Sequence, residues 1–455
     1  MVDGPDGGVR RSRYTVIVEG GDGDYLVYDT LSAAFLKTPG STIRFMLDDP
    51  AWSAAIRDLS PFQRYLRGIG VLVDTESEES DASRRMLEDH HARQDRFELF
   101  LLPHENCNFR CTYCYEAFAR NKMEPWVVEA TKQFILKQSG TLRTLSTSWF
   151  GGEPLLGYDV ISELSAFFVE VCHQAGVSYQ SGITTNGYLL DEEKARHLVQ
   201  DCAVRQFQIT LDGPCEQHDR RRHLVGGGAT YERIYRNLLS LKKVEGPFNA
   251  MIRVNFDHEV GAAMDDFLVR LRDDFTDDPR FLVHFFPIAN LGGNTGDEIN
   301  ELPLCDVNST RVLEYQLLEK AVDLGFRTLT RDQIRPLSST CYAADPRSLI
   351  VGADGTLYKC TVAFDDPRNQ VGVMEPGGTL RLDEARFNLW TEHAGASDPH
   401  CQSCTLNPSC QGMACPLHRM NTEGRACVPM KSDLPRTIRL LARELEQEAS
   451  RCQSR

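Results

Sequence analysis

The segment CNFRCTYC (107–114) sets the fold class and the chemistry expected of the whole chain. It places Cys107, Cys111 and Cys114 in the spacing C-x3-C-x2-C. Three clustered thiolates suit an iron–sulfur cluster or zinc, whereas a closed structural zinc site takes four ligands. No fourth cysteine or obvious histidine follows within the loop, and His104 before it reads as an ordinary loop residue. The segment therefore predicts a metal centre with one open position, with a structural zinc loop as the alternative.

Six short β-rich runs, the first directly before this segment, alternate with helical stretches. The runs are FELFLLP (97–103), TLSTSWF (144–150), YQSGITT (179–185), QFQITL (206–211), NAMIRVNF (249–256) and FLVHFFP (281–287). The helical stretches are VVEATKQFILKQ (127–138), ISELSAFFVEVCHQ (161–174), EEKARHLVQ (192–200), TYERIYRNLLSLKK (230–243) and AAMDDFLVRLRDD (262–274). Such alternation predicts an α/β fold with parallel strands, in an open doubly wound sheet or in a complete or partial barrel. The cysteine segment follows the first strand, where α/β folds place their sites.

The chain before this region predicts a small N-terminal α+β module. Residues 1–13 are glycine-rich and polar and read as a frayed tail. YTVIVEG (14–20) and DYLVYDT (24–30) predict two strands, and helical spacing of apolar residues recurs in SAAFLKT (32–38) and PAWSAAIRDLS (50–60). The charged stretch 75–95 predicts a linker or an exposed helix, and with it a domain boundary.

The region after the sixth strand is expected to be poor in strands. A helical stretch, CDVNSTRVLEYQLLEKAVDLGF (305–326), leads into a part rich in glycine, proline and cysteine. The chain then ends in LPRTIRLLARELEQEASR (434–451), a predicted helix. Its apolar stripe consists of Ile438, Leu441, Ala442, Leu445 and Ala449.

Composition narrows the classes of function. A length of 455 residues predicts two to four domains, at about 100 to 200 residues each. The 50 Lys and Arg against 65 Asp and Glu give a net charge of −15, which disfavours nucleic acid or an anionic membrane as a partner. Neither a signal peptide nor a membrane-spanning stretch is evident, so we expect a cytoplasmic protein. Fifteen cysteines in a reducing compartment then indicate metal ligation before disulfides.

The three-cysteine segment, with Tyr113 before the third cysteine, resembles the signature of the radical S-adenosylmethionine (radical SAM) superfamily. The resemblance implies that Cys107, Cys111 and Cys114 hold a 4Fe-4S cluster whose fourth iron is chelated by SAM. It also implies cleavage of SAM to a 5′-deoxyadenosyl radical, which abstracts hydrogen from the substrate. The family fold is a partial (β/α)6 barrel, in agreement with the six strands counted above.

Three further motifs support the resemblance, each at the end of a predicted strand. Gly151-Gly152-Glu153-Pro154 is similar to the family's GGEP motif, in which the carboxylate holds the SAM ammonium group. Thr184-Thr185-Asn186-Gly187 resembles the TNG segment, and Leu211-Asp212-Gly213-Pro214 with His218, Asp219 and Arg222 resembles the LDGP and HDxxR segments. The SAM-binding residues implied are Gly151, Gly152, Glu153, Pro154, Thr185, Asn186, Asp212 and Arg222. No catalytic residue beyond the cluster ligands is assigned.

A second group of cysteines resembles the seven-cysteine SPASM domain, which carries two auxiliary 4Fe-4S clusters. The family pattern assigns Cys341, Cys360 and Cys415 to the first auxiliary cluster and Cys401, Cys404, Cys410 and Cys427 to the second. Four residues separate Cys410 from Cys415, where the family usually has three. Because two fully thiolate-ligated clusters need eight cysteines, the first is expected to lack one cysteine ligand, unless Cys305 supplies it. Zinc is the alternative metal, since C-x2-C pairs build zinc ribbons.

The sequence predicts less about the roles of the other five cysteines. Cys172 and Cys202 lie in apolar helical contexts and read as packed core residues. Cys215 and Cys305 lie in predicted loops, where an extra ligand role is open, and Cys452 lies in the C-terminal fringe.

The expected organisation is an N-terminal module with its linker (1–95), a radical SAM partial barrel (96–330) and a cysteine-rich SPASM iron–sulfur domain with a C-terminal helix (331–455). The resemblance implies a maturase that acts on a ribosomally made peptide, forming a thioether or carbon–carbon crosslink, with three 4Fe-4S clusters and SAM as cofactors. Its partners would be a peptide with a leader sequence, which the winged-helix-like N-terminal module could recognise, and an electron donor such as flavodoxin or ferredoxin. The alternatives are a sulfatase maturase that forms formylglycine and a non-catalytic zinc-binding peptide scaffold.

Overall fold

The computed structural model describes residues 8–75, 77–291, 299, 302, 304, 307–392, 395, 397–422 and 424–453, which form two compact units. One unit contains residues 1–92, 329–344 and 392–455, and we call it the cysteine-rich unit. The other contains residues 93–328 and 345–391, and we call it the barrel unit.

The barrel unit is built on six parallel strands, and all six predicted strands are confirmed. They are β7 (Arg96–His104), β9 (Thr144–Gly151), β10 (Ser178–Thr185), β11 (Val204–Thr210), β13 (Asn249–Phe256) and β14 (Phe281–Pro287). Each pairs in parallel with the next along the chain, without closure between β14 and β7. The predicted partial (β/α)6 barrel is therefore confirmed.

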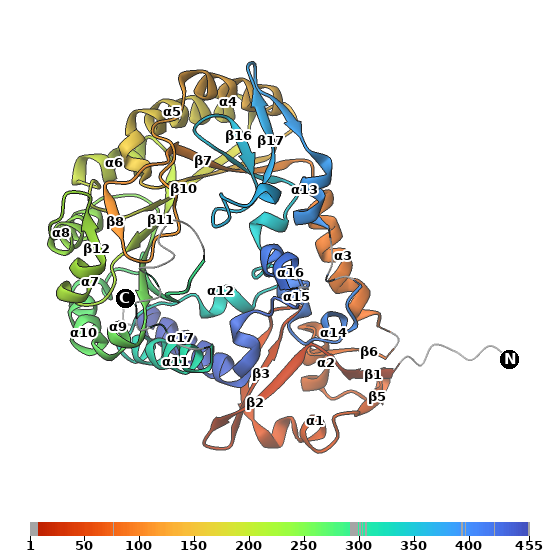
Figure 1. Ribbon diagram of the computed structural model, residues 1–455. Helices are drawn as coiled ribbons and strands as arrows, with labels where there is room; N and C mark the ends of the chain where they lie inside the picture. The colour runs from red at the N-terminus through yellow and green to blue at the C-terminus, as the bar shows by residue number, and fades with distance from the viewer. Residues whose placement is uncertain are drawn as a thin grey trace. The chain divides into compact units, whose positions relative to one another are not determined.

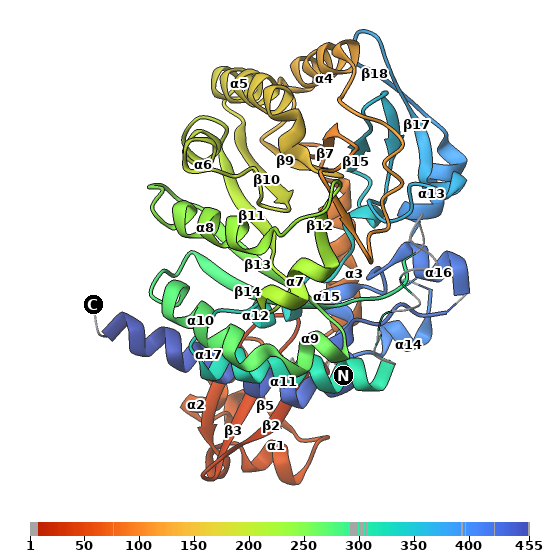
Figure 2. The ribbon, with the colours of Figure 1, turned by 60° about the vertical axis from the view of Figure 1, so that its left-hand side comes forward.

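The predicted crossover helices are also confirmed. They are α4 (Pro125–Gln138), α5 (Tyr158–Ala175), α6 (Glu192–Gln200), α8 (Tyr231–Lys242) and α10 (Met264–Phe275), and they line the outer face of the curved sheet (Figures 1 and 2). Alternate strand residues such as Leu145, Thr147 and Trp149 are buried, as a sheet covered by helices requires. The side chains on the opposite face of the strands are available to form the functional site.

Four further strands extend the sheet beyond β7, so the expectation of a strand-poor region after the barrel was wrong. They are β15 (Ser348–Val351), β16 (Thr356–Tyr358), β17 (Gln370–Glu375) and β18 (Thr379–Leu382). β15 pairs in parallel with β7, and the next three follow as antiparallel neighbours. Short strands among glycine-rich turns gave too little periodic signal to be found. The helix α13 (Glu384–Thr391) follows them.

Two small sheets form the N-terminal part of the cysteine-rich unit. The predicted hairpin is confirmed as β2 (Thr15–Gly21) and β3 (Asp24–Asp29), and β4 (Phe35–Pro39) adds a third strand. The second sheet has the order β5 (Ser53–Ala55), β1 (Gly8–Arg11), β6 (Leu72–Asp74). The helices are α1 (Arg44–Asp48) and α2 (Pro61–Gly68), the latter started by a capping box between Ser60 and Gln63.

Three expectations for this part were wrong. The described end of the expected tail, residues 8–11, forms the central strand β1, because backbone pairing with both neighbours holds a segment that lacks a hydrophobic pattern. Residues 32–38 lie mostly on β4, and residues 50–60 form β5 and a 3-10 turn instead of a helix. In both runs the side chains fill the core around Val9 and Leu66 from extended backbone, so tertiary packing overrides the helical spacing.

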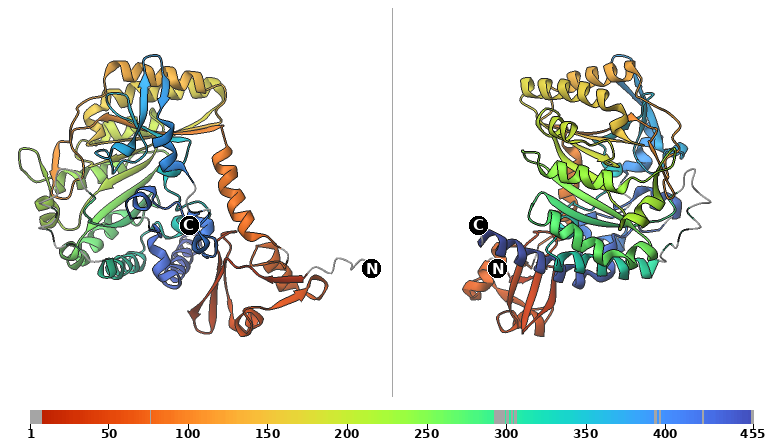
Figure 3. Two further views of the ribbon diagram at one scale, coloured as in Figure 1. Left: turned by 45° about the vertical axis from the view of Figure 1, so that its right-hand side comes forward. Right: turned by 90° about the vertical axis from the view of Figure 1, so that its left-hand side faces the viewer.

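The predicted linker forms α3 (Glu79–Ala92), a straight helix visible in Figure 3. Although the sequence of α3 is mostly polar, one face of the helix is buried and contains Glu79, Ser83 and Leu87. The remaining helices are α7 (Cys215–Arg221), α9 (His258–Ala262), α11 (Val307–Asp323), α12 (Thr330–Ile334), α14 (Pro399–Gln402), α15 (Asn407–Cys410), α16 (Pro416–Thr422) and α17 (Leu434–Gln453). The 3-10 turns are Gly40–Thr42, Ile56–Asp58, Pro154–Gly157, Tyr342–Ala344, Pro367–Asn369 and Pro429–Asp433.

The C-terminal helix α17 buries most of its predicted stripe. Ile438, Leu441 and Ala442 pack into a core with Val18 and Leu26 of the hairpin, and Leu445 lies at its edge. Ala449 is exposed, so the stripe ends one turn earlier than expected. Among the helices of the described residues, none is both long and apolar enough to cross a membrane.

Candidate functional site

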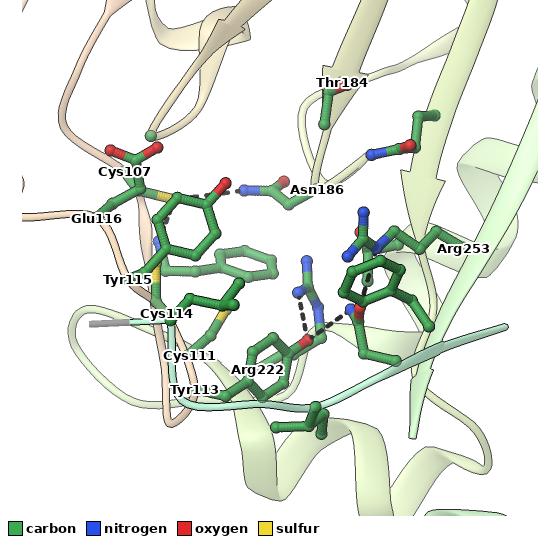
Figure 4. Close-up of a pocket in the computed structure, with 18 of the residues that line it drawn as sticks. Cys107, Cys111, Tyr113, Cys114, Tyr115, Glu116, Thr184, Asn186, Arg222 and Arg253 are labelled. Carbon is green, nitrogen blue, oxygen red and sulfur yellow. Dashed lines mark hydrogen bonds between the residues drawn. The ribbon is translucent and has the colours of Figure 1, made fainter. Parts of the chain in front are cut away.

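The three cysteines of the first segment line one cavity at the carboxyl ends of the barrel strands (Figure 4). Residues at the ends of β9, β10, β11, β13 and β14 complete its wall. β8 (Phe109–Cys111) runs through the segment and pairs with β12 (Arg222–Leu224), so that Cys111 lies opposite Arg222. The cysteine loop is thus fixed to the segment that follows the fourth barrel strand.

Backbone hydrogen bonds shape the loop around its sulfur atoms. The amide of Phe109 donates to Sγ of Cys107 at 3.3 Å, and the amide of Cys114 donates to the carbonyl oxygen of Cys111 at 3.1 Å. Burial raises the pKa of the Cys107 thiol to about 12 and raises the pKa of Cys111 and Cys114 as well. Thiolates in such surroundings require a positive partner, which a metal cluster provides.

The donor set fits an iron–sulfur cluster. No group of three or more Cys, His, Asp or Glu side chains among the described residues converges tightly enough for a single metal ion. Three thiols around the wall of one cavity instead suit a larger, multi-iron group with an open corner facing the remaining space.

Two glycines let the end of β9 approach the cysteine loop. A Cβ on Gly152 would lie 2.6 Å from the carbonyl carbon of Asn106, and one on Gly151 would lie 2.4 Å from the carbonyl oxygen of His104. Gly151 also has a φ of +119°, which favours glycine. Both glycines line the cavity, so the GGEP motif is built into the wall by close backbone contact.

The carboxylate of Glu153 lies behind this wall and is fully buried. Its oxygens accept hydrogen bonds from Thr185 Oγ1 at 2.7 Å and from the amides of Asn186 and Leu155 at 2.8 and 3.0 Å. Burial raises its pKa, and these donors oppose that rise. Neither Glu153 nor Pro154 is among the cavity-lining residues, so in this structure Glu153 ties the GGEP motif to the TNG segment.

The TNG segment faces the cavity at the end of β10. Thr184, Thr185 and Asn186 line it. The side-chain amide of Asn186 donates to Asn108 Oδ1 at 2.8 Å and lies 3.8 Å from Sγ of Cys107. This residue therefore links the third barrel strand directly to the first cysteine.

A buried hydrogen-bond network connects the cysteine loop with the LDGP and HDxxR segments. Tyr113 donates its hydroxyl hydrogen to Asp212, and the same hydroxyl oxygen accepts from Arg222 at 2.8 Å and from Asn255 at 3.1 Å. The second carboxylate oxygen of Asp212 accepts from the Asn255 backbone amide at 2.8 Å. Arg222 lines the cavity and Asp212 does not; Asp212 lies 3.9 Å from Nε of Arg222 and helps to orient it.

His218 and Asp219 organise the same region from behind. Nδ1 of His218 accepts from the Asp212 amide at 3.0 Å, which leaves the proton on Nε2 to donate to Thr230 at 3.1 Å. Burial holds the pKa of His218 well below its ordinary value, so the ring is neutral. Asp219 caps α8 by accepting from the amides of Thr230 and Tyr231.

The cavity residues missed from the sequence include four polar ones, Tyr115, Glu116, Arg253 and Asn255. Arg253 stacks its guanidinium on Phe286 at 4.0 Å and donates to Asn255, and no ion pair with a carboxylate is found for it among the described residues. Burial lowers its pKa. The Oε1 atom of Glu116 is buried and unbonded in the described part of the chain, and desolvation raises the pKa of this carboxyl to about 8. An arginine within an otherwise apolar predicted strand was the only signal in the sequence for Arg253.

Four of the C-terminal cysteines line one pocket of the cysteine-rich unit: Cys401, Cys404, Cys410 and Cys427. The structure thus brings together the residues assigned to the second auxiliary cluster. Cys341 and Cys415 belong to the same unit, whereas Cys360 lies after β16 in the barrel unit. Their grouping as the first auxiliary cluster stays a prediction.

The remaining cysteines largely match their expectations. Cys172 and Cys202 are buried core residues, as predicted. Cys215 is exposed at the start of α7, 3.4 Å from Asp219. Cys305 and the side chain of Cys452 lie outside the described residues.

Comparisons with known proteins agree with this geometry. Residues 101–267 match the family model described as the Radical SAM superfamily. The chain is 24% identical over 362 residues to a serine-type anaerobic sulfatase-maturating enzyme of Klebsiella aerogenes, covering 74% of this chain and 85% of the relative. It is 24% identical over 338 residues to a cysteine-type enzyme of the same name from Clostridium novyi (strain NT), covering 67% and 84%.

Two solved structures share the fold. One, a histidine-tagged anSMEcpe with bound AdoMet, has a TM-score of 0.58 at 16% identity and covers 77% of this chain and 98% of its own. Native anSMEcpe with bound AdoMet and the Cp18Cys peptide has a TM-score of 0.56 at 17% identity, covering 78% and 97%. The cysteine loop, the glycine wall and most of the partial barrel lie within the matched residues, so the chain is an enzyme that carries a radical SAM domain at residues 101–267.

Proposed function

We propose that this enzyme is a SPASM-type maturase that oxidises a residue within a peptide or protein substrate. The observation that carries the proposal is the single cavity that joins Cys107, Cys111 and Cys114 to the glycine wall and the TNG segment. The match to sulfatase-maturating enzymes and the fold shared with a peptide-bound neighbour support a peptide substrate. Reduced cysteine ligands further favour the cytoplasm as its location.

Each part of the cavity has a task in this reaction. Cys107, Cys111 and Cys114 would hold the cluster, and the Gly151–Gly152 wall with Asn186 would bind SAM beside it. Together these cofactors supply a 5′-deoxyadenosyl radical that abstracts hydrogen from the substrate. Arg222 is held by Tyr113 and Asp212 as a fixed, buried cation able to bind a carboxylate. Apolar residues such as Ile288 and Leu291 limit water at the opening.

Our first candidate product is a thioether or carbon–carbon crosslink. The matched Klebsiella relative covers only 74% of this chain, so the protein has a substantial part beyond that maturase. Crosslinking removes two hydrogens from the peptide and keeps its sulfur. The first electron leaves with the abstracted hydrogen, and the second must pass to an acceptor.

The second candidate product is formylglycine, as in the curated relatives by name. From a cysteine residue this reaction consumes water, releases sulfide and removes two electrons and two protons. Sulfide release therefore separates it from crosslinking.

The three-stranded sheet of the N-terminal part offers a place for a leader peptide. One of its faces packs on α17 through Val18 and Leu26, and the other packs through Val27 on the core around Val9. Both faces are covered, and β2 and β4 each pair only with β3 among the described strands. An extended peptide would add to one of these edges by backbone hydrogen bonds.

The test of the enzymatic proposal is anaerobic reconstitution with iron and sulfide, followed by SAM and dithionite. We expect iron and sulfide in excess of one 4Fe-4S cluster, little zinc, and formation of 5′-deoxyadenosine. Incubation with a cysteine-containing peptide then distinguishes the products by mass and by released sulfide. Bound zinc without iron would instead establish the scaffold alternative.

The leader proposal is tested by deleting residues 1–75 and measuring leader affinity by fluorescence polarisation. We expect affinity to fall while SAM cleavage persists. A folded truncation with unchanged leader affinity would refute recognition by this part of the chain.

A further inference from the structure

Three basic side chains share the pocket of the second cysteine group. Besides Cys401, Cys404, Cys410 and Cys427, the pocket wall contains Arg419, Arg425 and Lys431. Basic residues next to four thiols are unexpected if the cysteines only fill space. Their individual contacts show that the three cations differ in role.

Arg419 reaches the sulfur of Cys401 from α16. Its Nη2 lies 3.4 Å from Sγ of Cys401, and its Nε donates to the carbonyl oxygen of Gly412 at 2.9 Å. The second contact fixes the guanidinium in place, and the side chain is only 17% exposed. Gly412 itself has a φ of +70°, and a Cβ there would lie 3.1 Å from the same sulfur. The backbone at Gly412 therefore leaves room for the arginine–sulfur contact.

Lys431 reaches a second sulfur from the turn before α17. Its Nζ lies 3.6 Å from Sγ of Cys427. The ammonium group lies beside this sulfur at a more solvent-exposed position than the guanidinium of Arg419.

Arg425 lines the same pocket without a hydrogen bond to sulfur among the described residues. It donates to Asp398 at 2.6 Å, and that carboxylate also caps α14 by accepting from the His400 amide at 3.0 Å. Arg425 is therefore paired closely with Asp398, whereas Arg419 lies 3.9 Å from the same carboxylate and contacts sulfur as well. This makes Arg425 a matched control for the two residues that contact sulfur.

Hydrogen bonds and positive charge at the sulfur atoms raise the reduction potential of an iron–sulfur cluster, because the reduced cluster carries one more negative charge. We propose that Arg419 and Lys431 are positioning residues that raise the potential of the cluster held by Cys401, Cys404, Cys410 and Cys427. The inference rests on the proposed function, in which the oxidised cluster gains the one electron that the substrate radical loses. The two cations favour that transfer by stabilising the reduced cluster.

The experiment measures reduction potentials in the full chain. Cys107, Cys111 and Cys114 are replaced by Ala to remove the SAM-binding cluster, and the reconstituted protein is titrated redox-potentiometrically with EPR detection. A Cys404→Ala change identifies the signal of the cluster in question, and any other auxiliary signal serves as an internal reference. The variants are Arg419→Met, Arg419→Lys, Lys431→Met and Arg425→Met.

We expect Arg419→Met to make reduction about tenfold less favourable, which corresponds to a potential about 59 mV lower for a one-electron couple. Lys431→Met should make reduction less favourable by a smaller factor, because solvent screens the charge of Lys431. Arg419→Lys should recover most of the loss, and Arg425→Met should change little.

Unchanged potentials in Arg419→Met and Lys431→Met proteins that retain full iron and sulfide would overturn the inference. An equal shift in Arg425→Met would also overturn it, because charge in the pocket, rather than contact with sulfur, would then set the potential. If Arg419→Met loses its cluster, the exposed Lys431→Met variant decides the matter by the same measurement. A parent protein without auxiliary iron would refute the proposed function itself, and the iron count reveals that before any titration.

Discussion

Arg222 donates a hydrogen bond to the hydroxyl of Tyr113 at 2.8 Å, and so binds the residue between the second and third cysteines to a segment 109 positions away. Tyr113 in turn donates to Asp212, whose other oxygen is held by Asn255. The aromatic residue of the cysteine motif therefore anchors the loop to two other barrel strands.

Tyr113→Phe should weaken this anchor. The change removes a donor to Asp212 and an acceptor for Arg222, and an unsatisfied buried polar group costs about 1 to 3 kcal/mol. We expect a lower melting temperature of the barrel unit and slower 5′-deoxyadenosine formation. Tyr158→Phe is the control, since its hydroxyl bonds to His197 and is not part of the cavity wall. Equal losses of activity in both variants would contradict a specific role for Tyr113.

Replacement of Cys107, Cys111 and Cys114 by Ala should abolish SAM cleavage while leaving iron on the C-terminal cysteines. The cleavage reaction needs the SAM-binding cluster that this loop would hold, whereas the four-cysteine pocket lies in the other unit. Iron content and 5′-deoxyadenosine yield check both statements. Continued SAM cleavage by the triple variant would disprove the assignment of the site.

Gly152→Ala should damage the cavity without touching a cysteine. The new Cβ would lie 2.6 Å from the backbone of Asn106, which must move and take Cys107 with it. We expect loss of iron from the first site and a fall in SAM affinity, measured by equilibrium dialysis. Gly140→Ala is the matched control, because a Cβ there meets nothing within 4 Å. A Gly152→Ala protein with normal iron and SAM affinity would show that the wall tolerates a side chain.

Glu98 should make the stability of the barrel unit depend on pH. Burial, and secondarily Asp345, raise its pKa from 4.5 to about 7. The folded state thus binds a proton more tightly than the unfolded state. Stability from this group is complete below pH 4.5 and is lost as pH rises to about 7.

Glu98→Gln should therefore stabilise the protein more at pH 8 than at pH 5. Urea denaturation of both proteins at the two pH values gives the difference in free energy of unfolding. A difference that does not change with pH would mean that Glu98 titrates normally in the folded chain.

The sequence predicted the six barrel strands because each is a continuous β-rich run framed by helices of clear periodicity. It missed β1 and β4, whose backbones are held extended by pairing and packing partners distant in sequence. Local spacing carries no information about such partners. The strands β15 to β18 were missed because they are short and lie among glycine-rich turns, which leaves little periodic signal.

The candidate site was likewise predicted only in part from the sequence. Cysteine spacing identified the ligands, since chemistry requires those residue types close together. Arg253 was missed because a single arginine in a strand looks like a solvent-facing residue until the strand's neighbours are known. The internal hydrogen bonds of Glu153 were equally invisible, because its donors follow a different strand.

The parallel pairing of β15 with β7 affects how the chain can fold and be shortened. Until residues 348–351 are present, the strand that leads into the cysteine loop has an unpaired edge. Such an edge is a template for association with other chains. A fragment cut after Leu291 should therefore aggregate, although it contains every residue of the first cavity. During synthesis the barrel would likewise wait for its late strand, so nascent chains need protection until most of the protein has emerged.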